Sequence, residues 1–184
     1  MKYKKYIIFI TIISLIFYCR HQVINHDIPI ANIEFVKIER ENGIEGYYDL
    51  FFTSDIELTN NLRKEHTGGR IDCFFKNKKI NETDYIEDYK GYFLSSIGDL
   101  KLKTKTTKYN YVISTSFERK GYDNISSNFD NEEQLVLKGV SNLLNKDPKC
   151  ISCVATAVTM YGMPRRYISN TMYIPKENIK KIME

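Results

Sequence analysis

The chain lacks the residue patterns on which most enzyme chemistry depends. It has no tryptophan and only three histidines among 184 residues. Those histidines, His21, His26 and His66, show none of the paired spacing that a zinc site requires. Gly68-Gly69 is not followed by the Lys-Ser/Thr ending of a phosphate-binding loop, and no Gly-x-Ser-x-Gly motif of a serine hydrolase occurs. We therefore predict no catalytic residue, no cofactor and no metal, and a protein that is not an enzyme.

A strong excess of charge is also missing from most of the chain. The whole sequence has 27 basic and 23 acidic residues, a net charge of +4. Lys2, Lys4 and Lys5 lie within the first 19 residues, which contain no acid, so 24 basic and 23 acidic residues remain in the rest. A nucleic-acid partner would demand a concentrated basic face. The sequence therefore predicts no nucleic-acid partner.

The N-terminus carries the clearest pattern in the sequence. Its three lysines precede an unbroken apolar run at residues 7–18, in which Thr11 and Ser14 are the only small polar residues. A run of about 10 to 14 apolar residues is shorter than a bilayer span and is typical of a signal-peptide core. A helix that is apolar all round has no polar face to present to water. We predict that residues 1–19 are an export signal or a short membrane anchor, with the body outside the cytoplasm.

Cys19 stands directly after the apolar run, where a lipoprotein would have its lipidated cysteine. The residue before it should be small but is Tyr18, and no small-x-small cleavage pattern occurs before Ala31. A retained anchor, a lipidated Cys19 and a cleaved leader therefore all stay open. Each of them predicts a body in the cell envelope that faces the periplasm, and the first two hold it at the inner or outer membrane.

Three further cysteines, Cys73, Cys150 and Cys153, are candidates for a disulfide. Thiols tend to pair in an oxidising compartment, which favours a bridge from Cys73 to Cys150 or to Cys153. Such a bridge closes a loop of about 80 residues and stabilises the fold by roughly 4 kcal/mol. A redox pair of Cys150 and Cys153 is the alternative, but a thioredoxin-type motif opens a helix, and the β-branched Val154 and Thr156 favour a strand. We favour the structural disulfide.

Strand and helix patterns follow one another in blocks along the chain. Apolar positions at helical spacing predict an internal helix over 132–144 and a short C-terminal helix over 176–183, and a weaker pattern suggests one from Ser54 to about residue 65. Asn42-Gly43 predicts a hairpin turn, and Gly98-Asp99 a second turn. Runs of β-branched and aromatic residues predict strands at 33–38, 47–53, 70–76, 89–97, 100–107, 109–117, 150–161 and 167–174.

Because these elements do not alternate as β-α units, we predict an α+β fold. It is mainly an antiparallel β-sheet with one internal helix and a short C-terminal helix. Residues 1–19 form the signal or membrane-anchor segment and residues 20–32 a tether. Residues 33–184 are expected to form a single globular extracytoplasmic domain, since about 150 residues suit one domain.

Two residue patterns suggest a surface that binds a protein partner. Lys101, Lys103 and Lys105 alternate along a predicted strand, so they would share one face as a basic ridge that could steer an acidic partner. Lysines also protect an exposed strand edge from aggregation, which is the alternative. Tyr109 and Tyr111 lie close by, and tyrosine is common in interfaces, although it also fills the edges of cores. We name these five residues as partner-binding candidates.

The leader at residues 2–18, the small body and the cysteines Cys73, Cys150 and Cys153 resemble the small envelope-tethered immunity proteins of bacteria. Those proteins neutralise toxins delivered by contact-dependent systems such as type VI secretion. The stretches 52–55 and 149–153 are similar to segments of small exported enterobacterial proteins. The resemblance implies one cognate toxin as the partner, such as a lipase or a cell-wall enzyme whose active site is occluded, and it transfers no functional residue.

Two other functions stay open at this point. One is an accessory lipoprotein, pilotin-like protein or exclusion protein of an envelope secretion or conjugation system. The other is an envelope thiol-disulfide protein that uses Cys150 and Cys153.

Overall fold

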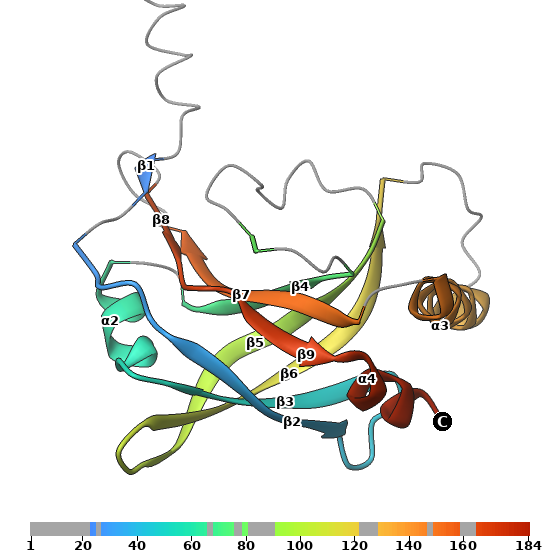
Figure 1. The fold of residues 1–184 in the computed structure, drawn as a ribbon, viewed down its shortest axis with the longest axis horizontal. Helices are drawn as coiled ribbons and strands as arrows, with labels where there is room; N and C mark the ends of the chain where they lie inside the picture. Colours follow the sequence, from blue (N-terminus) through green and yellow to red (C-terminus); the bar gives the residue numbers. More distant parts are fainter. Residues whose placement is uncertain are drawn as a thin grey trace, which may run out of the picture.

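A computed structural model of the protein describes residues 23–24, 27–65, 68–75, 79–80, 91–121, 129–146, 149–158 and 165–184. Within this part of the chain, no helix combines the length and the apolar composition that crossing a membrane requires. The elements, shown in Figure 1, are β1 (Val23–Ile24), β2 (Ile33–Arg40), β3 (Tyr47–Ser54), α2 (Leu58–Glu65), β4 (Arg70–Phe74), β5 (Gly91–Lys105), β6 (Tyr109–Lys120), α3 (Phe129–Lys146), β7 (Cys150–Val158), β8 (Arg165–Ile168), β9 (Met172–Pro175) and α4 (Lys176–Met183).

One twisted sheet contains all the strands that the structure describes. Its order is β1-β8-β7-β4-β5-β6-β3-β2, and β9 also pairs with β7. Only the short β1–β8 pair is parallel among these strands. The prediction of an α+β fold with a mainly antiparallel sheet, an internal helix and a short C-terminal helix is therefore confirmed.

The sheet curls so strongly that its two ends approach each other (Figure 1). β2 contacts β9, and the backbone N–H of Asn170 donates to the carbonyl oxygen of Ala31 at 3.0 Å. The side-chain oxygen of Asn170 accepts from the N–H of Ile33 at 2.8 Å. Helix α4 contacts both strands, and Nε of Arg40 donates to the carbonyl oxygen of Ile182 at 2.9 Å. These contacts close the concave side of the sheet around the core.

Alternation along the strands decides which side chains enter this core. On β3 the side chains of Tyr48, Leu50 and Phe52 are buried, while each residue between them is only half-buried. Successive side chains of a strand point to opposite faces, so the three buried ones share the concave face. A smaller apolar cluster, which includes Phe74 and Val154, packs on the opposite face. β4 and β7 are therefore covered on both sides, which explains their nearly continuous burial.

The folded domain begins before residue 33. Val23–Ile24 pairs with β8, and the side chains of Ile28 and Ala31 belong to the main core. The hydroxyl of Tyr167 accepts from the N–H of Ala31 at 2.8 Å and donates to the carbonyl oxygen of Pro29 at 3.2 Å. The described part of the segment that we expected to be a tether, 20–32, thus belongs to the domain. Its few apolar residues gave no periodic pattern from which this could be predicted.

Two of the predicted strand boundaries are wrong for local reasons. β5 continues through Gly98, where φ is +83° and the register with β6 shifts, so the turn predicted at Gly98-Asp99 is a bulge within one strand. The closing strand predicted at 167–174 is divided into β8 and β9. At the break, the hydroxyl oxygen of Ser169 accepts from the N–H of Ala155 at 2.9 Å, so a side chain replaces one backbone acceptor of the ladder.

Helix α3 confirms the predicted internal helix and extends it at both ends. Val136, Val140 and Leu144 are buried at intervals of four residues, as expected for one helix face. Leu135, by contrast, is 44% exposed. It lies about 100° around the helix from Val136, because a helix has 3.6 residues per turn.

Gly139 lets α3 approach the sheet closely. A Cβ atom added to Gly139 would lie 2.1 Å from Cζ of Tyr92, on β5. Alanine in a helix interior is about 1 kcal/mol more favourable than glycine. We expect Gly139→Ala to raise the free energy of unfolding by that amount in a Tyr92→Ala background, but to give no gain in the wild type. Urea unfolding of the four proteins measures this coupling, and an equal gain in both backgrounds would contradict it.

Candidate binding surfaces

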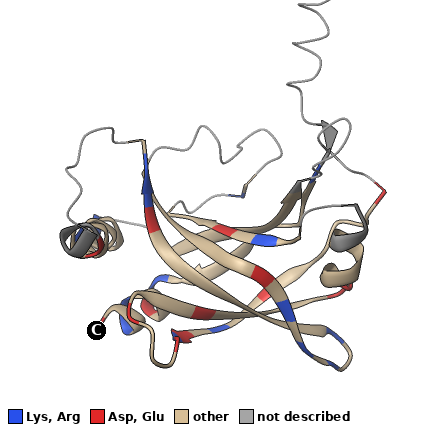
Figure 2. Cartoon of the chain, turned by 180° about the vertical axis from the view of Figure 1, so that it is seen from behind, with Lys and Arg blue, Asp and Glu red and all other residues tan. Residues whose placement is uncertain are grey.

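The three lysines of the predicted ridge are exposed on β5, but they do not share one face of the strand. Lys101 lies opposite Val112 of β6, and Lys105 lies opposite Tyr109. Val112 and Tyr109 are three residues apart, so Lys101 and Lys105 point to opposite faces. The register shift between Leu102 and Thr104 inserts the extra residue that breaks the alternation. The prediction of a single-faced ridge is therefore wrong, although basic residues do follow the β5–β6 hairpin (Figure 2).

This part of β5 is a sheet edge. Among the strands described, only β6 pairs with residues 101–105. Lysines and bulges at an unpaired edge prevent association with other strands. Two lysines in and near this part of β5 interact with other side chains. Nζ of Lys105 lies 5.0 Å from the ring centroid of Tyr109, and Nζ of Lys108 lies 2.5 Å from Oε2 of Glu34. Protection of the sheet edge explains the presence of these lysines without invoking a protein partner. Binding of a partner protein at this edge stays a prediction.

Tyr111 is a core residue and not part of a binding surface, whereas Tyr109 is half-buried. The Tyr111 ring is 1% exposed and stacks on Phe52 with ring centroids 5.4 Å apart. Its hydroxyl oxygen accepts from the N–H of Leu58 at 2.7 Å. This N–H opens helix α2 and has no acceptor within the helix. Including Tyr111 among the partner-binding candidates was therefore wrong, because its register places it on the concave face.

We expect Tyr111→Phe to lower the free energy of unfolding by about 1–3 kcal/mol, because the buried N–H of Leu58 would lose its acceptor. Tyr109→Phe is the matched control, and its effect should stay within about 0.5 kcal/mol, since Tyr109 is only half-buried and the substitution keeps its ring. Chemical denaturation of both variants measures the difference. Equal effects would mean that the bond to α2 contributes nothing.

A cleft that the sequence did not predict lies where the β2–β3 turn meets α3 and α4. It has a volume of about 450 Å³ and is lined by residues 40–41 and 43–48, by Glu133 and Leu137 of α3, and by Met183 of α4. A second cavity of about 410 Å³ continues between the two helices, with Lys138 and Lys180 among its lining residues. Leu137 and Met183 line both cavities, so the cavities meet at these two apolar residues, which we call the apolar floor.

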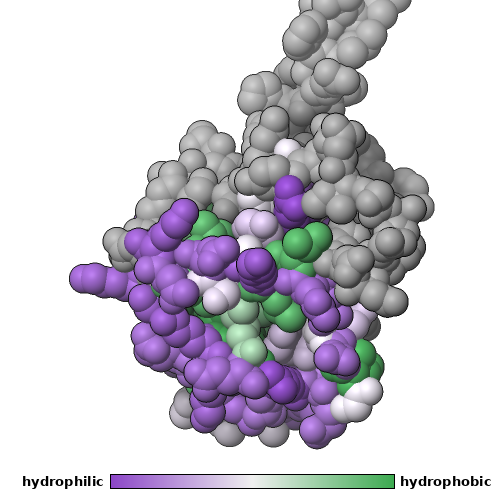
Figure 3. Space-filling model, turned by 90° about the vertical axis from the view of Figure 1, so that its right-hand side faces the viewer, coloured by the Kyte–Doolittle hydropathy of each residue, from purple (hydrophilic) through white to green (hydrophobic). Residues whose placement is uncertain are grey.

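Apolar surface on this side of the molecule is surrounded by hydrophilic residues (Figure 3). Ile44, in the β2–β3 turn, lines the cleft and is 49% exposed. An apolar area with a polar rim is the arrangement found in protein interfaces. Ile44 stands among glycine, asparagine and glutamate in a turn, and an apolar residue in that position was the available sequence signal. The rest of the cleft comes from three separate parts of the chain.

Acidic residues dominate the end of the cleft near the β2–β3 turn. Glu41, Glu45 and Glu133 line it together with Arg40. The pKa of the buried Tyr48 hydroxyl is raised, mainly by burial, while Arg40 lowers it and Glu133 and Glu45 raise it further. These charges therefore lie close together around one hydroxyl. The Glu41 carboxylate also accepts a hydrogen bond from the Ser114 hydroxyl, which fixes its position.

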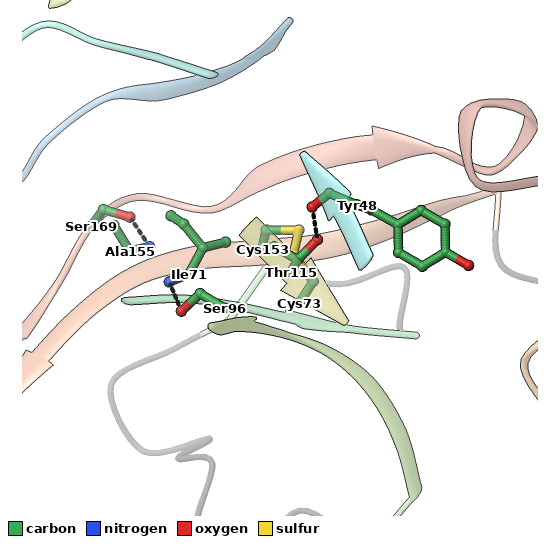
Figure 4. Close-up of a disulfide and its surroundings, with 8 residues drawn as sticks. All are labelled: Tyr48, Ile71, Cys73, Ser96, Thr115, Cys153, Ala155 and Ser169. Atoms are coloured by element: carbon green, nitrogen blue, oxygen red, sulfur yellow. Dashed lines mark hydrogen bonds between the residues drawn. A yellow bond between two sulfur atoms is a disulfide. The ribbon is translucent and has the colours of Figure 1, made fainter. Parts of the chain in front are cut away.

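The structure contains one of the disulfides that the sequence left open. Cys73 of β4 and Cys153 of β7 lie directly opposite each other with Cα atoms 4.0 Å apart, and their sulfur atoms are bonded. Both side chains are fully buried on the core face of the sheet. Figure 4 shows the bridge near Thr115, whose hydroxyl donates to the carbonyl oxygen of Tyr48 at 2.8 Å. The bridge therefore joins two neighbouring strands inside the core.

Cys150 lies outside this disulfide. It is half-buried on β7 and three residues from Cys153 in a regular stretch of strand, so the two side chains point to opposite faces. Burial raises the pKa of the Cys150 thiol, whereas redox-active cysteines have a lowered pKa. The structure thus gives no support to a Cys150–Cys153 redox pair. Cys19, the candidate for lipidation, lies outside the described residues.

Two carboxyl groups lie on the convex face of the sheet, where Asp72 is buried and Glu118 is more exposed. Burial raises the pKa of both Asp72 and Glu118, and Arg70 opposes the shift in each case. The hydroxyl of Thr156 donates to Oδ2 of Asp72 at 2.9 Å. In the parts of the chain that the structure describes, no group of three or more histidine, cysteine, aspartate or glutamate residues is arranged to hold a metal ion.

Comparison with known proteins identifies no relative. No protein-family model matches the sequence, and neither a curated protein nor a solved structure matches it significantly.

Proposed function

We propose that this chain is an exported, membrane-tethered binding protein that docks on another protein, and that it is an immunity protein for a cognate toxin. The cleft between the β2–β3 turn, α3 and α4 carries the proposal. Its apolar floor, with Leu137 and Met183, and its charged rim match the core and rim of a protein interface. A protein that blocks the active site of a toxin needs such a surface and no catalytic residues.

The cleft is built from elements that the fold holds in place. Arg40, at the end of β2, donates a hydrogen bond to the carbonyl oxygen of Ile182 in α4. Gly139 lets α3 pack closely against Tyr92. Glu133 of α3 lies against Gly46 in the turn, where an added Cβ would be 2.5 Å from its carboxylate oxygen. A surface that is already ordered loses little conformational entropy when it binds, which favours tight association.

Two observations support export. A fully buried disulfide between Cys73 and Cys153 is of the kind that persists in oxidising compartments and is rare in the cytosol. The basic and apolar pattern of residues 1–19 independently predicts an export signal or anchor. Both agree with a periplasmic site of action.

Periplasmic expression of the product of the neighbouring gene, with and without this chain, tests the proposal. We expect growth arrest that co-expression of the chain relieves. Ile44→Asp should abolish the relief, because it places a charge on the apolar part of the cleft. Ile30→Asp is the matched control, since Ile30 is also exposed, at 63%, but does not line the cleft. A toxic neighbour that the chain does not neutralise, or equal effects of the two variants, would argue against this function.

A further inference from the structure

We infer that the cleft binds an apolar segment of the partner protein that carries a lysine or arginine at the end nearest the β2–β3 turn. The inference rests on the proposed function, because it specifies the partner's chemistry at the same site. It follows from the shape of the cleft, the charge of its lining and its position in the domain.

The shape of the cleft favours a chain segment. Its two cavities, of about 450 and 410 Å³, adjoin at Leu137 and Met183, which line both of them. Each is within the range of about 300–1,000 Å³ that suits compact ligands. A protruding segment of a partner can place several side chains along these adjoining cavities, as peptides do when they dock by anchors at regular intervals. The apolar floor then requires apolar anchors.

The charges of the residues that line the cleft indicate which charge the bound segment carries and at which end. Among the described residues, three glutamates and one arginine line the cavity at the turn, and their formal charges sum to −2. Nε of Arg40 already donates to the carbonyl oxygen of Ile182. The cavity between the helices is lined instead by Lys138, Lys180 and Glu184. A cleft with one sign of charge concentrates ions of the other sign, so a basic side chain belongs at the turn end.

The position of the cleft leaves it accessible in a tethered protein. β1, the first described strand, lies at the opposite end of the molecule from α3 and α4 (Figure 1). A tether that leaves the domain from β1 therefore leaves it away from the cleft.

Selection of short random peptides displayed on phage against the full chain in detergent micelles tests the inference. We expect the enriched peptides to combine apolar residues with lysine or arginine. Leu137→Asp should reduce the enrichment by at least about tenfold, which corresponds to roughly 1.4 kcal/mol. The double variant Glu45→Lys/Glu133→Lys should instead enrich peptides with aspartate or glutamate.

The double variant Glu57→Lys/Glu177→Lys is the control, because it makes the same change of charge at residues that do not line the cleft. It should select the same peptides as the wild type, and circular dichroism checks that all variants are folded. The inference would be overturned if the wild type enriched acidic peptides, or if it enriched peptides no more than Leu137→Asp does. It would also be overturned if Glu45→Lys/Glu133→Lys did not reverse the charge of the selected peptides.

The protection assay separates this inference from the proposed function. If the wild type neutralises a toxin and Glu45→Lys/Glu133→Lys does so equally well, the inferred charge preference is overturned and the immunity function stands. If the chain neutralises no toxin but selects basic apolar peptides with the expected reversal, the immunity function fails and the chemistry of the cleft is supported.

Discussion

Replacing Cys73 and Cys153 together by alanine should lower the free energy of unfolding by roughly 4 kcal/mol. The two residues are 80 positions apart, so their bond removes many conformations from the unfolded chain. Because both side chains are fully buried, the substitution also removes core contacts, which adds to the loss. Domains of this size are typically stable by about 5–15 kcal/mol, so the loss is a large part of the total.

Urea unfolding of the oxidised wild type, the reduced wild type and the double variant measures this effect. The reduced wild type should lose most of this stability, and the double variant somewhat more, because it also lacks the buried cysteine side chains. Cys150→Ala is the control and should change the stability by about 1 kcal/mol or less, since Cys150 is half-buried and outside the bridge. If the reductant leaves the unfolding midpoint of the wild type unchanged, the bond does not stabilise the domain.

Phe52→Ala should lower the free energy of unfolding by about 3–5 kcal/mol, while the same change at the adjacent Phe51 should cost only about 1 kcal/mol. Phe52 is 1% exposed on the concave face and stacks on Tyr111. Phe51 points to the other face and is half-buried, with Nζ of Lys37 at 4.4 Å from its ring centroid. The pair compares two identical side chains whose environments differ only through alternation along β3.

Chemical denaturation of the two single variants is sufficient for this comparison. A larger loss for Phe51→Ala would mean that the opposite face of β3 is the buried one, and would contradict the register of β3 with β2 and β6.

Local patterns predicted most of the elements but not their neighbours. The C-terminal helix has the predicted bounds, 176–183, and the strands predicted at 33–38 and 47–53 form the predicted hairpin. These patterns depend on residues close in sequence, such as the turn at Asn42-Gly43. By contrast, the pairing of β4 with β7 joins segments about 80 residues apart, and nothing local indicates which strand lies beside which.

The errors at the candidate site have the same origin. Whether Tyr111 faces the core, and whether Lys101 and Lys105 share a face, depends on the register and on one bulge. A shift of one residue moves every side chain of a strand to the other face, and the sequence pattern of β5 and β6 does not fix that shift. The cleft could not be predicted because its lining is assembled only when α3 and α4 pack beside the β2–β3 turn.

For the tethered protein that we propose, the cross-strand bridge also has a mechanical consequence. When tension is applied through the chain, the force crosses from β4 to β7 through the sulfur atoms. The chain between Cys73 and Cys153 then cannot lengthen, although without the bond its 80 positions would extend by roughly 270 Å. Stretching can therefore unravel only the segments outside this covalent loop.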